Sequence, residues 1–128
     1  MLAVELKNVK KIYSLDEVEL PVLNGIDLKI KKGEFVSITG PSGSGKSTML
    51  HLIGALDKPT KGRVIIDGTD ISKMDDNKLA NLRGRKIGFV FQSFNLVPRL
   101  NALENVMLPM WFAGIDGDGR KKKAEELL

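Results

Sequence analysis

The chain has 128 residues, of which 42% are apolar and 28% charged, as is ordinary for a soluble globular protein. No stretch approaches the 18 consecutive apolar residues of a membrane span, the N-terminus lacks the regions of a signal peptide, and the absence of cysteine excludes disulfides and thiolate metal sites. The net charge of +4 is spread along the chain except for the run at 120–123, so we expect a cytoplasmic protein without a nucleic-acid partner.

The first half of the chain predicts strands followed by a strand, loop and helix unit. Apolar and polar residues alternate over 4–9 and 26–31, which is typical of antiparallel strands with one solvated face. The apolar run 35–39 predicts a further strand that leads into a glycine-rich loop. Apolar residues then recur at helical spacing as far as Leu56, and we expect Pro59 to stop that helix, because proline has no N–H to donate.

The middle of the chain predicts a hairpin, a short helix and another strand. Residues 63–66 form a strand that runs into Asp67-Gly68, a dipeptide suited to a tight turn. Ser72 or Asp75 can cap a helix that passes through Leu79 and Leu82. We expect Gly84 to end that helix in a left-handed conformation, before a strand over 86–91.

The last part of the chain predicts two helices. Residues 101–104 have the form of a capping box, and Pro109 should kink or end the helix that follows. Asp118 can cap a final helix. Because no C-cap glycine or polar tail precedes Leu128, we expect a fragment that ends within a domain.

A phosphate-binding loop is the strongest motif in the sequence. The eight residues that match G-x-x-x-x-G-K-[ST] without a mismatch are Gly40, Pro41, Ser42, Gly43, Ser44, Gly45, Lys46 and Ser47, and Thr48 follows them. The glycines let backbone N–H groups point inward at the start of a helix, where the helix dipole also favours an anion. We expect Lys46 to reach the β and γ phosphates, Ser47 to bind Mg²⁺ and Thr48 to contact the α phosphate. The bland alternative is a glycine-rich turn with an incidental lysine.

Several classes of protein share this loop, and other residues argue between them. A dinucleotide-binding fingerprint would need glycine where Thr48 stands. Residues 77–80 nearly match a guanine-reading motif, but Ala80 lacks the carboxylate that would bind the base. Asp67 could pass for the metal-binding aspartate of a Walker B motif, yet the glycine after it favours a hairpin turn. Specificity for guanine and a dinucleotide-binding fingerprint are therefore not supported.

From its first strand to its last residue the chain resembles the ATPases of ABC transporters, and its motifs follow one another in family order. The segment 11–13 resembles the one whose aromatic residue stacks on adenine, which the resemblance assigns to Tyr13. Tyr13 as an ordinary half-buried strand residue is the alternative. Residues 89–92 resemble the Q-loop, in which the amide oxygen of Gln92 would meet Mg²⁺ or the attacking water.

Beyond Gln92 the resemblance becomes more specific. The stretch 91–109 is similar to ATPases of lipoprotein-releasing and macrolide-exporter systems, although Asn101 stands where threonine is commoner. Nothing after Gln92 resembles the signature motif of the family, the aspartate and glutamate of its Walker B motif, or its switch histidine. The resemblance therefore covers the first part of an ATPase domain, and we do not expect these 128 residues alone to hydrolyse ATP.

The resemblance implies an α/β P-loop NTPase fold of ABC ATPase type, truncated, with an N-terminal antiparallel β part and the start of a helical subdomain. It makes 1–128 the N-terminal part of one nucleotide-binding domain, with the phosphate loop at 40–48, the Q-loop near 92 and the helical subdomain from about 94. Lys46 and Gln92 would serve catalysis.

The same resemblance implies the cofactors ATP and Mg²⁺. The partners would be membrane permease subunits, which hold the protein at the inner face of the cell membrane, and a second ATP-binding domain. Two alternatives stay open at this point. One is a soluble ATPase acting on DNA or ribosomes, and the other is a fragment that binds nucleotide without hydrolysing it.

Overall fold

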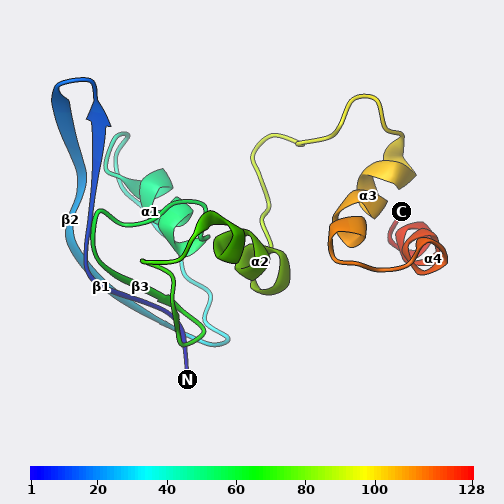
Figure 1. The fold of residues 1–128 in the computed structure, drawn as a ribbon, viewed down its shortest axis with the longest axis horizontal. Coiled ribbons are helices and arrows are strands. Elements are labelled where there is room, and N and C mark those ends of the chain that lie inside the picture. Colours follow the sequence, from blue (N-terminus) through cyan, green and yellow to red (C-terminus); the bar gives the residue numbers. More distant parts are fainter. The chain divides into compact units, whose positions relative to one another are not determined.

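A computed structural model describes residues 1–128, which divide into two compact units, 1–83 and 84–128 (Figure 1). The first unit contains a four-stranded antiparallel sheet, in the order β2-β1-β3-β4, and the helix α1. The strands are β1 (Leu2–Leu15), β2 (Val18–Lys31), β3 (Lys61–Ile66) and β4 (Thr69–Asp70). The strands predicted at 4–9, 26–31 and 63–66 are confirmed, and the first two are parts of one long hairpin.

The predicted turn between β3 and β4 is also confirmed. Asp67 and Gly68 both have positive φ angles, 47° and 79°, which is the requirement of a tight two-residue hairpin turn. Ile66 and Thr69 pair directly on either side of the turn. The Nζ atom of Lys32 lies 2.5 Å from a carboxylate oxygen of Asp67, so this carboxylate belongs to the turn and its ion pair.

The core of the first unit lies between the sheet and α1. Leu6 pairs with Val64 across β1 and β3, and both side chains are fully buried. Leu52 of α1 (Lys46–Ile53) is also fully buried, and α1 contacts both β2 and β3. The other buried apolar residues of this unit are Val9, Leu23, Ala55, Ile66, Ile71 and Leu79. This packing fixes α1, and with it the phosphate loop, on the sheet.

Two helix ends differ from the prediction. Helix α1 ends at Ile53, where Gly54 is its C-cap, so Pro59 does not stop it. Ala55 follows with a φ of 53° and is fully buried. The left-handed backbone at Ala55 therefore ends the helix before Pro59 is reached. Helix α2 (Asp76–Lys86) runs past Gly84, which has no positive φ. The prediction that Gly84 ends this helix was wrong.

Of the two caps considered for α2, the structure selects Asp75. Its Oδ1 atom accepts a hydrogen bond of 2.8 Å from the backbone N–H of Lys78. That bond is the main reason why the pKa of Asp75 lies below its ordinary value. The hydroxyl oxygen of Ser72 instead accepts from the backbone N–H of Val64, and so holds the chain after β4 against β3.

The predicted strands at 35–39 and 86–91 do not form, and this is the largest correction to the sequence analysis. Neither segment pairs with any strand of the sheet. The side chains of Phe35 and Val90 are almost wholly exposed. Strands of parallel sheets are stable when neighbours pair with them and helices cover both faces, and no such cover is present over these segments. An apolar run by itself therefore does not make either segment a strand.

The second unit holds two helices that contact each other, α3 (Ala102–Phe112) and α4 (Gly117–Leu127). The predicted capping box is confirmed, because Asn101 Oδ1 accepts from the N–H of Glu104 at 2.9 Å and Glu104 Oε2 accepts from the N–H of Asn101 at 2.8 Å. Pro109 neither ends nor breaks α3. Its own carbonyl accepts from the N–H of Ala113, so the hydrogen-bond ladder resumes after the one missing donor.

The cap of α4 is two residues earlier than predicted. Asp116, rather than Asp118, accepts a hydrogen bond of 2.9 Å from the N–H of Gly119. This bond is the largest cause that lowers the pKa of Asp116 below its ordinary value. Two aspartates separated by one glycine offer the same signal in sequence, and only the backbone conformation distinguishes them.

Asn101→Ala should destabilise α3 by about 1 kcal/mol, because it leaves the first helical N–H groups without their side-chain acceptor. The measurement is the free energy of unfolding by urea, followed by far-ultraviolet circular dichroism. Asn101→Asp is the control, because its carboxylate can accept the same bond and should retain nearly full stability. Equal losses in both variants would contradict the assigned cap.

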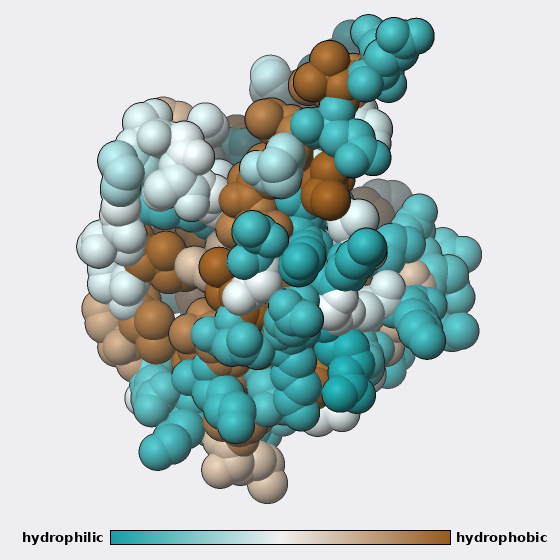
Figure 2. All heavy atoms as spheres, turned by 90° about the vertical axis from the view of Figure 1, so that its left-hand side faces the viewer, coloured by the Kyte–Doolittle hydropathy of each residue, from teal (hydrophilic) through white to brown (hydrophobic).

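The surface of the molecule mixes charged and apolar side chains (Figure 2). Near the tip of the β1–β2 hairpin, Leu15, Val18 and Leu20 are exposed by about half or more. No helix of the protein is both long and apolar enough to cross a membrane.

Candidate functional site

The loop 40–45 lies directly before α1 and has the backbone conformation of an anion-binding loop. Gly40, Gly43 and Gly45 have φ angles of 158°, 78° and 86°. A side chain at Gly45 would stand 2.8 Å from a methyl carbon of Leu23, and one at Gly40 would stand 2.8 Å from the hydroxyl of Ser44. Gly43 has open space around it but a φ that disfavours other residues. The positive φ therefore favours glycine at all three positions, and at Gly45 the neighbouring Val22 and Leu23 also leave little space for a side chain.

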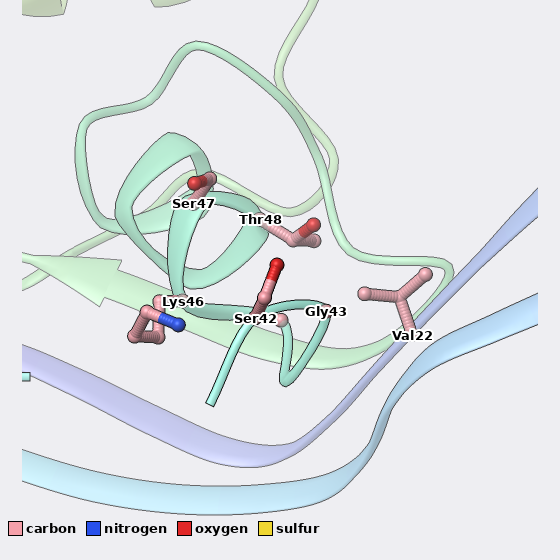
Figure 3. A pocket seen from close by; sticks show the side chains of 7 residues that line it. Val22, Ser42, Gly43, Lys46, Ser47 and Thr48 are labelled. Carbon is pink, nitrogen blue, oxygen red and sulfur yellow. The ribbon is translucent and has the colours of Figure 1, made fainter. Parts of the chain in front are cut away.

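A pocket of about 260 Å³ opens at this loop (Figure 3). Its lining residues are Val22, Ser42, Gly43, Gly45, Lys46, Ser47 and Thr48. All but Val22 belong to the predicted phosphate loop, so the structure brings the loop residues together around one space. The pocket is smaller than the sites that enclose whole drug-sized ligands, and its size suits phosphate groups.

Val22 is the lining residue that the sequence analysis missed. It belongs to β2, and its backbone oxygen would lie 3.1 Å from a side chain placed at Gly45. The strand thus supplies a wall of the pocket and prevents any larger residue at the end of the loop. One valine among the apolar residues of a strand carries no signal in sequence that marks it as part of a site.

The charged and hydroxyl groups of the pocket lie at the first turn of α1. Lys46 Nζ donates to the carbonyl oxygen of Pro41 at 2.6 Å and lies 3.5 Å from the hydroxyl oxygen of Ser44, so the ammonium group is held over the loop. Ser47 and Thr48 follow on the same turn (Figure 3). No carboxylate lines the pocket. The positive end of a helix and one ammonium group together fit a phosphate anion.

Tyr13 lies in β1, in the same unit as the loop but outside the pocket lining. It pairs with Leu20 of β2, two residues along the strand from Val22. Its hydroxyl donates to Asp57 Oδ2 at 3.2 Å, and the Nζ atom of Lys11 lies 4.9 Å from the ring centroid. A contact of Tyr13 with the base of a nucleotide stays a prediction.

Gln92 lies in the second unit, in an exposed bend that follows residues 87–91, which form no strand. The first unit holds the phosphate loop, so a contact of Gln92 with Mg²⁺ or water at that loop stays a prediction. The strand expected to lead into Gln92 is absent. Phe89 and Phe91 before it stack on each other with ring centroids 5.5 Å apart.

The family follows from the match of most of the chain. Residues 23–128, which include the whole phosphate loop and Gln92, match the ABC transporter family. The chain belongs to this family. The resemblance inferred from the motifs is thereby confirmed.

Two curated relatives bear out the narrower resemblance to lipoprotein-releasing and macrolide-exporting systems. The lipoprotein-releasing system ATP-binding protein LolD of Anaeromyxobacter dehalogenans is 56% identical over 110 residues, which are 86% of this chain and 46% of that protein. The macrolide export ATP-binding/permease protein MacB of Syntrophobacter fumaroxidans is 48% identical over 122 residues, which are 93% of this chain and 17% of that protein.

A solved structure confirms the fold class. It is the dimeric post-hydrolysis state of the ATP-binding cassette MJ0796, bound to ADP and Pi; a relative carrying the same designation comes from Methanocaldococcus jannaschii. The TM-score is 0.87 at 55% identity, over 96% of this chain and 54% of that one. The fold is therefore that of an ABC ATPase cassette. The chain spans about half the length of two curated relatives, ABC transporter ATP-binding proteins of Thermotoga maritima and Methanocaldococcus jannaschii, and less than a fifth of MacB.

Proposed function

We propose that this chain is part of the ATP-binding subunit of an ABC transporter, and that it binds MgATP at the loop 40–48. The observation that carries the proposal is the loop itself, because Gly43, Gly45, Lys46 and the first turn of α1 line one pocket that has an ammonium group and no carboxylate. The relatives of this family, one of which has been solved with ADP and Pi, support ATP as the nucleotide.

Each polar group of the pocket has a defined task in this proposal. Backbone N–H groups of the loop donate to phosphate oxygens, and Lys46 exchanges its bond with the Pro41 carbonyl for one with the β and γ phosphates. The hydroxyl of Ser47 and the amide oxygen of Gln92 are the proposed Mg²⁺ ligands, and Thr48 contacts the α phosphate. When bound, Mg²⁺ neutralises charge on the phosphates.

We further propose that residues 1–128 form the N-terminal part of one nucleotide-binding domain, with the Q-loop at Gln92 and the helical subdomain from about residue 94. The intact domain hydrolyses ATP as a pair with a second such domain, and drives transport through membrane permease subunits. The protein then lies on the inner face of the cell membrane. The names of LolD and MacB, which refer to lipoprotein release and macrolide export, support transport over work on DNA or ribosomes.

The test of the proposal is calorimetric titration of the purified protein with MgATP, with MgGTP and with magnesium tripolyphosphate. We expect saturable binding of all three ligands, because the loop recognises phosphates. Binding of neither nucleotide by the folded protein would overturn the proposal. Association with a membrane permease after copurification would support its transport part, and salt-sensitive binding of nucleic acid in its place would contradict that part.

Tyr13→Ala should weaken MgATP binding by about 1 to 3 kcal/mol, because an aromatic face that stacks on a base contributes about that much. Tyr13→Phe should lose less affinity than Tyr13→Ala, since it keeps the ring. Both variants should bind magnesium tripolyphosphate as the unaltered protein does, because this ligand has no base. Unchanged ATP affinity in Tyr13→Ala would make Tyr13 an ordinary strand residue.

A further inference from the structure

A cluster of three polar side chains connects Tyr13 with the end of α1. The carboxylate of Asp57 is its centre. Asp57 Oδ1 accepts from Lys11 Nζ at 2.7 Å and from the backbone N–H of Lys58 at 2.7 Å, whereas Oδ2 accepts from the hydroxyl of Tyr13 at 3.2 Å. Lys11 Nζ also donates to the carbonyl oxygen of Lys58 at 2.8 Å. Tyr13 and Lys11 are thus both tied to the chain after α1.

The cluster is shielded enough for its charges to matter. The side chain of Lys11 is 12% exposed and that of Asp57 is 31% exposed. Burial by itself raises the pKa of Asp57, but the hydrogen bonds from Lys11 and from the N–H of Lys58 outweigh it, so that the pKa lies below its ordinary value. Asp57 is therefore charged at neutral pH and holds Lys11 by an ion pair.

Lys11 also acts on the ring of Tyr13. Its Nζ atom lies 4.9 Å from the ring centroid, within the range of a cation–π interaction. The ammonium group therefore lies over one face of the ring, while the hydroxyl bond to Asp57 limits the swing of the Tyr13 side chain about its Cα–Cβ bond. A ring restrained in this way loses less freedom when a planar ligand stacks on it.

The backbone joins this cluster to the phosphate loop through α1. The backbone N–H of Asp57 bonds to the carbonyl oxygen of His51 in the last turn of α1, and the first turn of that helix carries Lys46. Thr60 fastens the same segment to β1, since its N–H donates to Lys10 and its hydroxyl oxygen accepts from the N–H of Ile12. The position of Tyr13 relative to the loop is thus set by both ends of one short helix.

We propose that Asp57, together with Lys11, is a positioning residue that holds the Tyr13 ring ready to stack on the base of the nucleotide whose phosphates the loop 40–48 binds. The proposal rests on the proposed function, which places the base at Tyr13. It goes beyond it by assigning roles to Asp57 and Lys11, which do not line the phosphate pocket.

The test compares a ligand that has a base with one that has none. Asp57→Asn should weaken MgATP binding about fivefold, which is the lower end of the stacking contribution of one base. It should leave the affinity for magnesium tripolyphosphate unchanged. Lys11→Met, which keeps an apolar stem and removes the charge, should give the same pattern. Lys32→Met is the matched control, because it removes a lysine–aspartate pair elsewhere on the sheet and should change neither affinity.

A double-mutant cycle separates positioning from general stability. In the Tyr13→Ala background, Asp57→Asn should cause no further loss of ATP affinity, because no ring remains to be positioned. The proposal is overturned if the losses add, if both ligands are weakened equally, or if neither Asp57→Asn nor Lys11→Met changes ATP binding. Circular dichroism confirms that each variant is folded, and a variant that unfolds is replaced by the other. If the unaltered protein binds ATP and neither Asp57→Asn nor Lys11→Met changes that binding, only this inference is refuted. If the unaltered protein binds no nucleotide, the proposed function is refuted as well.

Discussion

Lys46→Ala is expected to lower the affinity for MgATP by about 10- to 100-fold, the range that corresponds to losing a hydrogen bond from a charged donor. Lys46 is the one charged side chain that lines the pocket, and its ammonium group is held over the loop by the carbonyl of Pro41. Removing it leaves the phosphates with backbone donors only. The measurement is calorimetric titration with MgATP.

The fold should survive this change, because the Lys46 side chain is bonded only within the exposed loop. Circular dichroism and the urea midpoint should therefore match those of the unaltered protein. Lys32→Ala, which removes an equal charge outside the pocket, is the control for a general electrostatic effect. Unchanged affinity in a folded Lys46→Ala variant would mean that the phosphates bind elsewhere.

The phosphate loop could be predicted from sequence because its physics is local. Glycine at 40, 43 and 45 fixes where the backbone can turn, and the residue after Gly45 starts a helix. The loop therefore needs few distant contacts to adopt its shape. The turn at Asp67-Gly68 and the capping box at 101–104 succeeded for the same reason, since each depends on residues within one turn of the chain.

The strands expected at 35–39 and 86–91 were wrongly predicted, because the stability of a strand depends on the strands that pair with it. The apolar runs at 35–39 and 86–91 have the composition of buried strands. What decides is whether other strands pair with them, and the sheet of this chain ends at β2 on one side and β4 on the other. Exposed apolar segments of this kind tend to pair with another segment or another chain, as the edge strand of a sheet does.

The sequence analysis missed Val22 and Asp57 for a related reason. Val22 enters the pocket through the register of the β1–β2 hairpin, and Asp57 reaches Tyr13 across 44 residues of sequence. Neither relation has a periodicity that could reveal it. Tyr13 and Gln92 were found only through the resemblance of their surroundings to a family, and their contacts with the nucleotide stay predictions.

The 128 residues by themselves are expected to bind MgATP without releasing phosphate at a sustained rate. Transfer of a phosphoryl group to water needs the phosphates and metal to be placed, a water to be oriented, and usually a group that accepts the proton of that water. Lys46, Ser47 and Gln92 are proposed to meet the first two needs. The third has no candidate, because no carboxylate lines the pocket.

The two carboxylates weighed for that task are engaged elsewhere. Asp67 lies in the hairpin turn with Lys32, and Glu104 closes the capping box of α3. Asp57, which binds Lys11 and Tyr13, has a lowered pKa and is a poor proton acceptor for that reason. We therefore expect no group of this chain to complete the reaction.

The measurement is phosphate release from the purified 128 residues, with the Lys46→Ala variant as the control for contaminating ATPases. The positive control is a chimera in which the remaining half of the MJ0796 cassette follows residue 128, since that cassette matches 96% of this chain at 55% identity. The chimera should release phosphate and lose this activity with Lys46→Ala, because it combines the phosphate loop with the part of the domain that this chain does not span. Steady, Lys46-dependent release from the 128 residues alone would contradict the prediction, and would mean that one of the carboxylates assigned here to a turn, a cap or an ion pair reaches the γ phosphate and accepts the proton.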